Sequence, residues 1–254
     1  MSKLIKLLEQ LGRENPPRLG FGMKPAQKPN PEMLLLGCAK DWKSLDKKNI
    51  SGIDGIIFGE KNQKGTRRKP NSSFLEGIPW GVILESPTEK ETSELLKQGC
   101  DFIALSSLNV KVEATKEEEL GHFLFMPSGL SQDDQQALAG LPIDGIFVDS
   151  ISTEAWTLEE LLLLSKLRKE IGKTFILKIN IIPSSWELEC LHNIGIDGLI
   201  IEIESQTDTE INTLSTLIQG LPKKSNQRDK LIPSLGNLSD LQNTLPEEDE
   251  DEDE

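Results

Sequence analysis

The sequence contains few of the residues on which common catalytic and metal sites depend. Its 254 residues include no tyrosine, two histidines and three cysteines. The cysteines, at positions 38, 100 and 190, form no CxxC pair and are too few for a disulfide framework, so we expect a reducing, cytoplasmic setting. No apolar run approaches the roughly 20 residues that cross a bilayer, and we therefore expect no membrane association.

Basic residues are also scarce relative to acidic ones. The chain has 42 acidic and 28 basic side chains and a net charge of −14, but residues 247–254 are all acidic. Without them the counts are 34 and 28, a net charge of −6. A run of like charges cannot bury apolar area, so we predict a disordered acidic tail at 247–254 after a linker at 222–246. A mildly acidic body argues against nucleic-acid binding.

A short motif recurs along the rest of the chain. A turn residue, an apolar residue and aspartate precede an apolar stretch at Asp54, Asp144 and Asp197, and a weaker copy contains Asp101. The spacings between successive aspartates are 47, 43 and 53 residues, which is long enough for two strands and two helices. Each copy is typical of a helix end, a tight turn and the start of a buried strand.

Further apolar segments lie midway between these copies, which gives eight predicted strands. They begin near residues 33, 55, 80, 102, 122, 145, 175 and 198. Most segments between them are typical of helices, and the clearest is 157–171, with a capping box from Thr157 to Glu160 and a stop at Gly172. The segment 60–77, with Gly65 and Pro70, is more typical of a loop.

Regular alternation of strands and helices predicts parallel βαβ units. We therefore predict a single (β/α)8 TIM barrel over residues 33–221, preceded by an N-terminal helix and a proline-rich lead-in at 1–32. An open, doubly wound sheet is the alternative architecture.

The strand starts resemble those of phosphate-binding-type TIM barrels, a group that includes ribulose-phosphate epimerases, the histidine and tryptophan biosynthesis barrels and flavin-dependent nitronate oxygenases. In that group, glycine-rich turns after strands seven and eight hold a phosphate. Here the corresponding segments are 180–185 and 202–205, which contain no glycine, and Pro183 lacks an amide donor. The family's phosphate residues therefore cannot be assigned, and the sequence identifies no cofactor.

In a TIM barrel the active site lies at the carboxyl ends of the strands. Strand alternation predicts that Lys178, Asp149 and Glu202 point into the lumen there, and these are our candidate catalytic residues. Other polar residues near this mouth are candidate substrate-binding groups: Lys40, Glu85, Ser106, Asn180, Glu204, and Arg67 with Arg68 in the basic loop after strand two.

The role of Lys178 has two interpretations. Its amine could have a lowered pKa and form a Schiff base or accept a proton. Alternatively, it could form an ion pair with Glu202 that fills the lumen. The mouth carboxylates could bind Mg²⁺ or Mn²⁺, but a solvated rim is the better explanation, and we assign no metal ligands. Neither His122 nor His192 is placed for catalysis, and Cys38 is best explained as a buried apolar residue.

Two functional hypotheses follow. The first is a lyase or isomerase that acts on a small anionic metabolite through the lumen lysine and the mouth carboxylates. The second is a non-catalytic TIM-barrel protein that binds a protein partner or serves in assembly, having lost the phosphate site. The polar mouth favours the first, and the missing phosphate turns favour the second.

Overall fold

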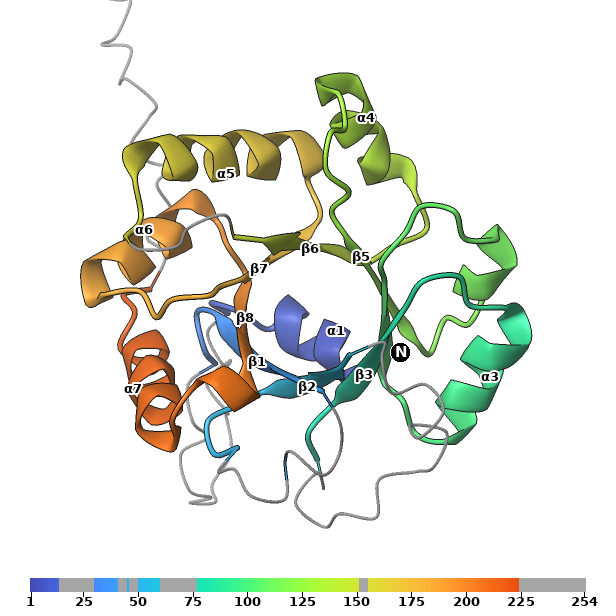
Figure 1. The fold of residues 1–254 in the computed structure, drawn as a ribbon, viewed down its shortest axis with the longest axis horizontal. Helices are drawn as coiled ribbons and strands as arrows, with labels where there is room; N and C mark the ends of the chain where they lie inside the picture. Colours follow the sequence, from blue (N-terminus) through green and yellow to red (C-terminus); the bar gives the residue numbers. More distant parts are fainter. Residues whose placement is uncertain (14–29, 41–44, 46–49, 60–76, 151–154, 224–254) are drawn as a thin grey trace, which may run out of the picture. The chain divides into compact units, whose positions relative to one another are not determined.

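The computed structural model describes residues 1–13, 30–40, 45, 50–59, 77–150 and 155–223. Eight parallel strands close into a barrel in the order β1 to β8, surrounded by an outer layer of helices (Figure 1). The predicted TIM barrel is confirmed, and the open doubly wound sheet is wrong because β1 pairs with β8, from Leu34 opposite Gly198 to Cys38 opposite Glu202. The predicted acidic tail and its linker lie outside the described residues, apart from 222 and 223.

The strands begin within one residue of the predicted positions. They are β1 (Leu34–Ala39), β2 (Gly55–Phe58), β3 (Trp80–Leu84), β4 (Phe102–Leu105), β5 (Gly121–Phe125), β6 (Gly145–Asp149), β7 (Thr174–Lys178) and β8 (Gly198–Glu202).

The described α-helices are α1 (Lys3–Glu9), α3 (Glu89–Lys97), α4 (Gln132–Ala137), α5 (Leu158–Ile171), α6 (Ser185–Ile194) and α7 (Asp208–Gln219). Short 3₁₀ helices add η3 (Val112–Thr115), η4 (Leu138–Gly140) and η5 (Ile203–Ser205). The predicted capping box at Thr157 is present, and α5 ends at Gly172 with a left-handed φ of 65°. None of the helices in these ranges is long and apolar enough to cross a bilayer.

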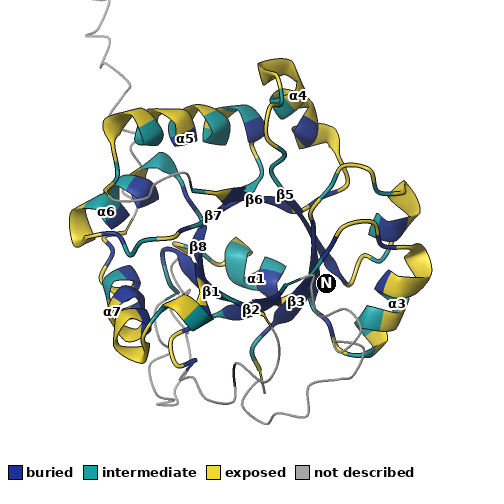
Figure 2. Ribbon diagram, viewed as in Figure 1, coloured by how far each residue is buried: buried dark blue, intermediate teal, exposed yellow. Residues whose placement is uncertain are grey.

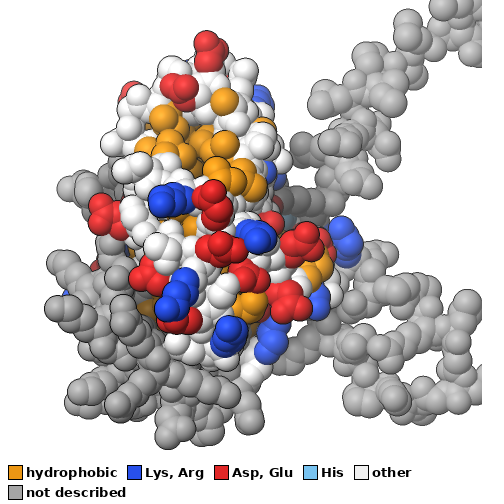
Figure 3. All heavy atoms as spheres, turned by 90° about the vertical axis from the view of Figure 1, so that its right-hand side faces the viewer, with side chains coloured by type: hydrophobic (Ala, Val, Ile, Leu, Met, Phe, Trp, Pro, Cys, Tyr) orange, Lys and Arg blue, Asp and Glu red, His pale blue; other side chains and the backbone are white. Residues whose placement is uncertain are grey.

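The outer layer is thin between β4 and β5, where the connection forms only the 3₁₀ helix η3. A shallow apolar groove lies there, lined mainly by Leu108, Val110, Val112, Leu141 and Pro142. Figure 3 views the side of the molecule that carries α3 and η3, where apolar side chains gather beside an area of mixed charge.

The barrel lumen is filled with apolar side chains, and most strand residues are buried, whereas Asp149 and Glu202 at the carboxyl ends of β6 and β8 are exposed (Figure 2). Five phenylalanines are among the largest fully buried residues, and Phe123 stacks on Phe147 with ring centroids 4.8 Å apart. The lumen-filling cluster, which we call the inner cluster, consists of Leu4, Leu34, Leu36, Ile57, Phe102, Ala104, Phe123, Phe147, Ile176 and Ile200. A second, larger cluster packs the outward faces of the strands against the helices.

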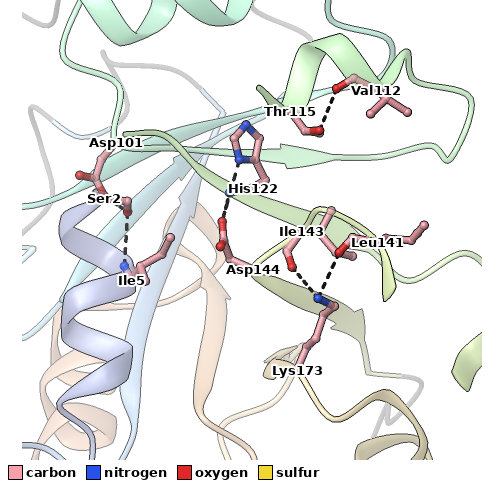
Figure 4. A network of polar contacts seen from close by, with 10 residues as sticks. All are labelled: Ser2, Ile5, Asp101, Val112, Thr115, His122, Leu141, Ile143, Asp144 and Lys173. Atoms are coloured by element: carbon pink, nitrogen blue, oxygen red, sulfur yellow. Dashed lines mark hydrogen bonds and ion pairs between the residues drawn. The ribbon is translucent and has the colours of Figure 1, made fainter. Parts of the chain in front are cut away.

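The N-terminal helix α1 closes the amino-terminal end of the barrel. Its residue Leu4 is fully buried in the inner cluster. The carboxylate of Asp101, just before β4, accepts hydrogen bonds from the Ser2 hydroxyl (2.7 Å) and the amides of Lys3 (2.7 Å) and Leu4 (2.9 Å). Asp101 and Ser2 lie side by side at the start of α1 in Figure 4. This carboxylate therefore satisfies donors that the helix itself leaves unpaired.

The other three aspartates of the repeat share a different role. Asp54 accepts the Leu35 amide at 2.9 Å, and Asp197 accepts the Phe175 amide at 2.8 Å. Asp144 accepts the His122 amide at 2.7 Å, and the two residues lie together in Figure 4. Each of these aspartates lies in the turn just before one strand, and its carboxylate binds the start of the preceding strand. The contact joins strands in pairs, which explains why the motif recurs at alternate strands.

We expect Asp101→Ala and Asp144→Ala to have separable effects. Each should lower the free energy of unfolding by about 1–2 kcal/mol, because partly buried amide donors lose their acceptor. Only Asp101→Ala should accelerate hydrogen exchange at the amides of Lys3 and Leu4, measured by mass spectrometry, with Asp144→Ala as the matched control. Equal exchange in both variants would show that Asp101 does not hold α1.

Candidate functional site

The structure brings the three candidate catalytic residues together at the carboxyl end of the barrel. Asp149, Lys178 and Glu202 are the last residues of β6, β7 and β8, and each follows a member of the inner cluster by two residues. In the sheet register Asp149 lies opposite Lys178, and Glu202 lies opposite Cys38. Because side chains two apart in a strand share a face, all four side chains point toward the lumen.

Lys178 lies between the two carboxylates. Its Nζ is 3.2 Å from Oε1 of Glu202 and 3.9 Å from Oδ1 of Asp149. The lysine side chain is 23% exposed, whereas those of Glu202 and Asp149 are 47% and 67% exposed. The ammonium group therefore lies below the carboxylates, at the boundary between the apolar lumen and solvent.

The ionisation of Lys178 is decided by two opposing effects. Burial lowers the pKa of this amine, but the hydrogen bond and negative charge of Glu202, with the charge of Asp149, raise it more. The net shift is upward from the ordinary value of 10.5, so the side chain is an ammonium ion near neutral pH. This direction favours the ion-pair interpretation of Lys178 over the lowered-pKa interpretation, and the contact distances agree with it.

Cys38 lies at the same end of β1 and packs against the inner cluster. Burial raises the pKa of its thiol to about 11, and the positive charge of Lys178 offsets this only in part. The nearby carboxylates raise the pKa further. The sulfur is consequently a neutral thiol under ordinary conditions and a poor nucleophile.

The other described candidates surround this centre and bind mainly to the backbone. Glu204 lies in η5, beyond the end of β8, so the inward and outward alternation of a strand does not apply to it. Its Oε1 accepts the Lys40 amide at 2.7 Å. The Asn180 side chain donates to the Ser150 carbonyl at 3.4 Å.

Two further candidates follow β3 and β4. The Ser106 hydroxyl donates to the Leu84 carbonyl at 3.4 Å, which links the ends of these strands. Glu85 is exposed immediately after β3. Arg67 and Arg68 lie outside the described residues, so their predicted role in substrate binding stays a prediction. Among the described residues, no group of three or more His, Cys, Asp or Glu side chains is arranged to hold a metal ion.

The histidines lie away from this centre. His122 is the second residue of β5, at the opposite end of the barrel, where burial lowers its pKa although Asp144 is 3.9 Å away. Nε2 of His192 is 3.5 Å from Oε2 of Glu32, and both side chains are buried. Sequence reasoning missed Glu32, because it stands in the lead-in 160 residues before its partner and no local pattern connects them.

The fold is similar to that of known TIM-barrel enzymes. A mutant tryptophan synthase alpha-subunit from the hyperthermophile Pyrococcus furiosus has a TM-score of 0.55 and 11% identity, over 75% of this chain and 98% of that one. KGPDC from Streptococcus mutans has a TM-score of 0.60 and 13% identity, over 74% of this chain and 99% of that one. At these identities the likeness shows the barrel fold alone. Neither a protein-family model nor a curated protein matches the sequence.

We expect iodoacetamide to alkylate Cys38 slowly near neutral pH and faster as the pH approaches about 11, because only the thiolate reacts. Lys178→Met removes the cation that lowers the thiol pKa and should slow the reaction further at each pH. Mass spectrometry of the Cys38 peptide measures the rate, and Cys190 in the same digest is the control. Rapid labelling of Cys38 at neutral pH would contradict the raised pKa.

We also expect Lys178→Met to change the free energy of unfolding by no more than about 1 kcal/mol, because a methionine fills similar volume and the carboxylates left behind are substantially exposed. Urea denaturation measures this change. A loss of several kcal/mol would show that the ion pair is a structural plug of the lumen, since a purely functional lysine is dispensable for folding.

Proposed function

We propose that the protein is an enzyme of the lyase or isomerase kind that acts on a small anionic metabolite at the carboxyl end of its barrel. The observation that supports this most is the Lys178 ammonium 3.2 Å from Glu202, at the top of an otherwise apolar lumen. A partly desolvated charge is costly to maintain, and TIM-barrel active sites occupy this position.

The raised pKa of Lys178 favours a role as a cation over a role as an amine nucleophile. In this proposal a carboxylate, Glu202 or Asp149, takes a proton from a carbon next to a substrate carbonyl. The electron pair moves onto the carbonyl oxygen, and the Lys178 ammonium stabilises the negative charge that forms there.

The two reaction types share this first step. Where the deprotonated carbon carries a hydroxyl, the hydroxyl proton passes to the former carbonyl oxygen and the carbon-bound proton returns to the former carbonyl carbon, so that the carbonyl re-forms at the other position; this is an isomerisation. Where the next carbon carries a leaving group, the carbonyl re-forms, a carbon–carbon double bond forms and the group departs with its electron pair; this is a lyase reaction. The two carboxylates beside Lys178 offer both a base and, once protonated, an acid.

The anionic character of the substrate is inferred from the basic side chains near the carboxyl end of the barrel. Lys178 is the cation at the centre, and Lys40 is exposed at the end of β1. In the sequence, Arg67 and Arg68 follow β2, whose carboxyl end opens on the same side of the barrel. The segments after β7 and β8 contain no glycine, so we propose that side-chain charges, and not a glycine-rich phosphate turn, bind the substrate.

A binding or assembly role is the second candidate. It is favoured by exposed apolar side chains on the outer helices, among them Leu158 and Trp186. These side chains lie in the outer layer, whereas Lys178 lies in the lumen, so the two roles do not compete for the same residues.

The enzymatic proposal is tested by proton exchange. The protein is incubated in D₂O with pyruvate, oxaloacetate, glucuronate and galacturonate, and loss of the substrate C–H signal is followed by NMR. We expect exchange with at least one compound, and a decrease of about 10²-fold or more in Lys178→Met and Glu202→Gln.

The control is an ion pair of the same chemistry that lies far outside the lumen. Lys116 and Glu89 are substantially exposed in the outer layer and 3.1 Å apart, so Lys116→Met and Glu89→Gln should exchange at the wild-type rate. Absence of exchange with all four compounds, or equal rates in the lumen and control variants, would count against this proposal.

A further inference from the structure

A helix in the outer layer of a barrel normally has polar side chains on its solvent side, but α5 has exposed apolar side chains there. Leu158, Leu162 and Leu163 are 85%, 57% and 46% exposed. With Glu159 and Lys166, which are exposed on the same side, they form what we call the α5 face. Figure 2 shows exposed residues along the outer side of this helix. A contiguous exposed apolar patch of this kind marks an interaction surface.

The neighbouring helix extends the apolar area. Trp186, in the first turn of α6, is 70% exposed. The next residue, Glu187, accepts the amide of Trp156 at 3.1 Å, which places the start of α6 beside the start of α5. The two helices are adjacent in the outer layer (Figure 1). Exposed tryptophan is the residue type most enriched among side chains that dominate binding energy.

The charges of the α5 face are arranged symmetrically about its centre. Glu159 stands three residues before Leu162, and Lys166 stands three residues after Leu163. At about 1.5 Å per residue, each charge lies roughly 5 Å along the helix from the midpoint between the two leucines. Neither of these charged side chains forms an ion pair or hydrogen bond with another residue that the structure describes.

We propose that the α5 face binds a second copy of this chain. Two α5 helices related by a two-fold axis that passes through this midpoint and is perpendicular to the helices run antiparallel. This arrangement places Glu159 of each copy opposite Lys166 of the partner subunit. The contact thus has two equivalent ion pairs around a centre of four leucines, as an isologous interface requires. This inference concerns the outer layer and does not rest on the proposed function.

The apolar groove near η3 fits a second copy less well. It is concave and is lined mainly by apolar residues, including Leu108 and Val112, so two copies related by a two-fold axis would face each other hollow to hollow. The α5 face is the surface of a helix, and convex helices pack directly against each other. The groove therefore provides a matched comparison surface for the test.

Sedimentation velocity of the full chain over a concentration series tests the proposal. We expect a monomer–dimer equilibrium whose association constant decreases about tenfold or more in Leu162→Asp, because a charge is buried at the centre. Val112→Asp makes the same change at a residue of the groove that is 71% exposed, and should leave association unchanged. A monomeric wild type, or a dimer that only Val112→Asp dissociates, would overturn the proposal.

A charge exchange tests the orientation of the helices. Glu159→Lys should weaken the dimer, since it places like charges opposite each other, and adding Lys166→Glu should restore it. Both variants carry the same lysine in the first turn of α5, so restoration separates the interface from any effect on the helix dipole. Failure of the double variant to recover association would exclude the antiparallel arrangement.

Zero-length carbodiimide crosslinking of mixed ¹⁴N and ¹⁵N protein gives an independent readout. Glu159 and Lys166 are about 10 Å apart along their own helix, so the isotope pattern must distinguish a link within one chain from a link between copies. We expect a peptide pair that joins them and carries mixed isotopes, which identifies the link as intermolecular. A crosslinked dimer without this pair would place the interface elsewhere.

Discussion

The lumen of this barrel is filled by apolar side chains from the strands and from α1, and it closes only because β1 hydrogen-bonds to β8 over five residue pairs. That register decides which side chains meet at the carboxyl end. Cys38 lies opposite Glu202, and Lys178 and Asp149 lie on the neighbouring strands. A shift of one residue in any of these strands would turn its polar end residue outward and an apolar one inward.

The repeated aspartates hold this register from the other end of the barrel. Asp54, Asp144 and Asp197 each accept an amide at the start of the preceding strand, so alternate strand pairs are fixed by the same contact. Asp101 binds the start of α1 instead, and this exception supplies the helix that closes the lumen at its amino-terminal end. The aspartate motif therefore both aligns the strands and holds the helix that closes the lumen. The site around Lys178, at the opposite end of the barrel, depends on the motif because it depends on the strand register.

Much of this architecture could be predicted from sequence because its signals are local. A tight turn with aspartate before an apolar stretch marks a strand start within a few residues, and alternation along β7 and β8 indicates the inward direction of Lys178 and Glu202. The contacts that sequence did not indicate join distant segments. Asp101 binds residues 97 to 99 positions away, and Glu32 approaches His192. β8 ends at Glu202, so Glu204 lies in a 3₁₀ helix that strand alternation does not detect.

The ionisation of Lys178 shows why the site chemistry needed the structure. Sequence alone left two interpretations of Lys178 open, a buried amine with a lowered pKa and an ion pair with Glu202. In the structure the hydrogen bond and charge of Glu202, together with the charge of Asp149, raise the pKa by more than burial lowers it.

The same contacts of Lys178 change the chemistry that the mouth can support. An ammonium ion between two carboxylates can stabilise negative charge and exchange protons, but it cannot attack a carbonyl carbon until it is deprotonated. Any substrate that reaches Lys178 must compete with Glu202 for the ammonium hydrogens. A small anion with its own carboxylate or carbonyl oxygen can do so, because the contact it makes replaces the one it breaks.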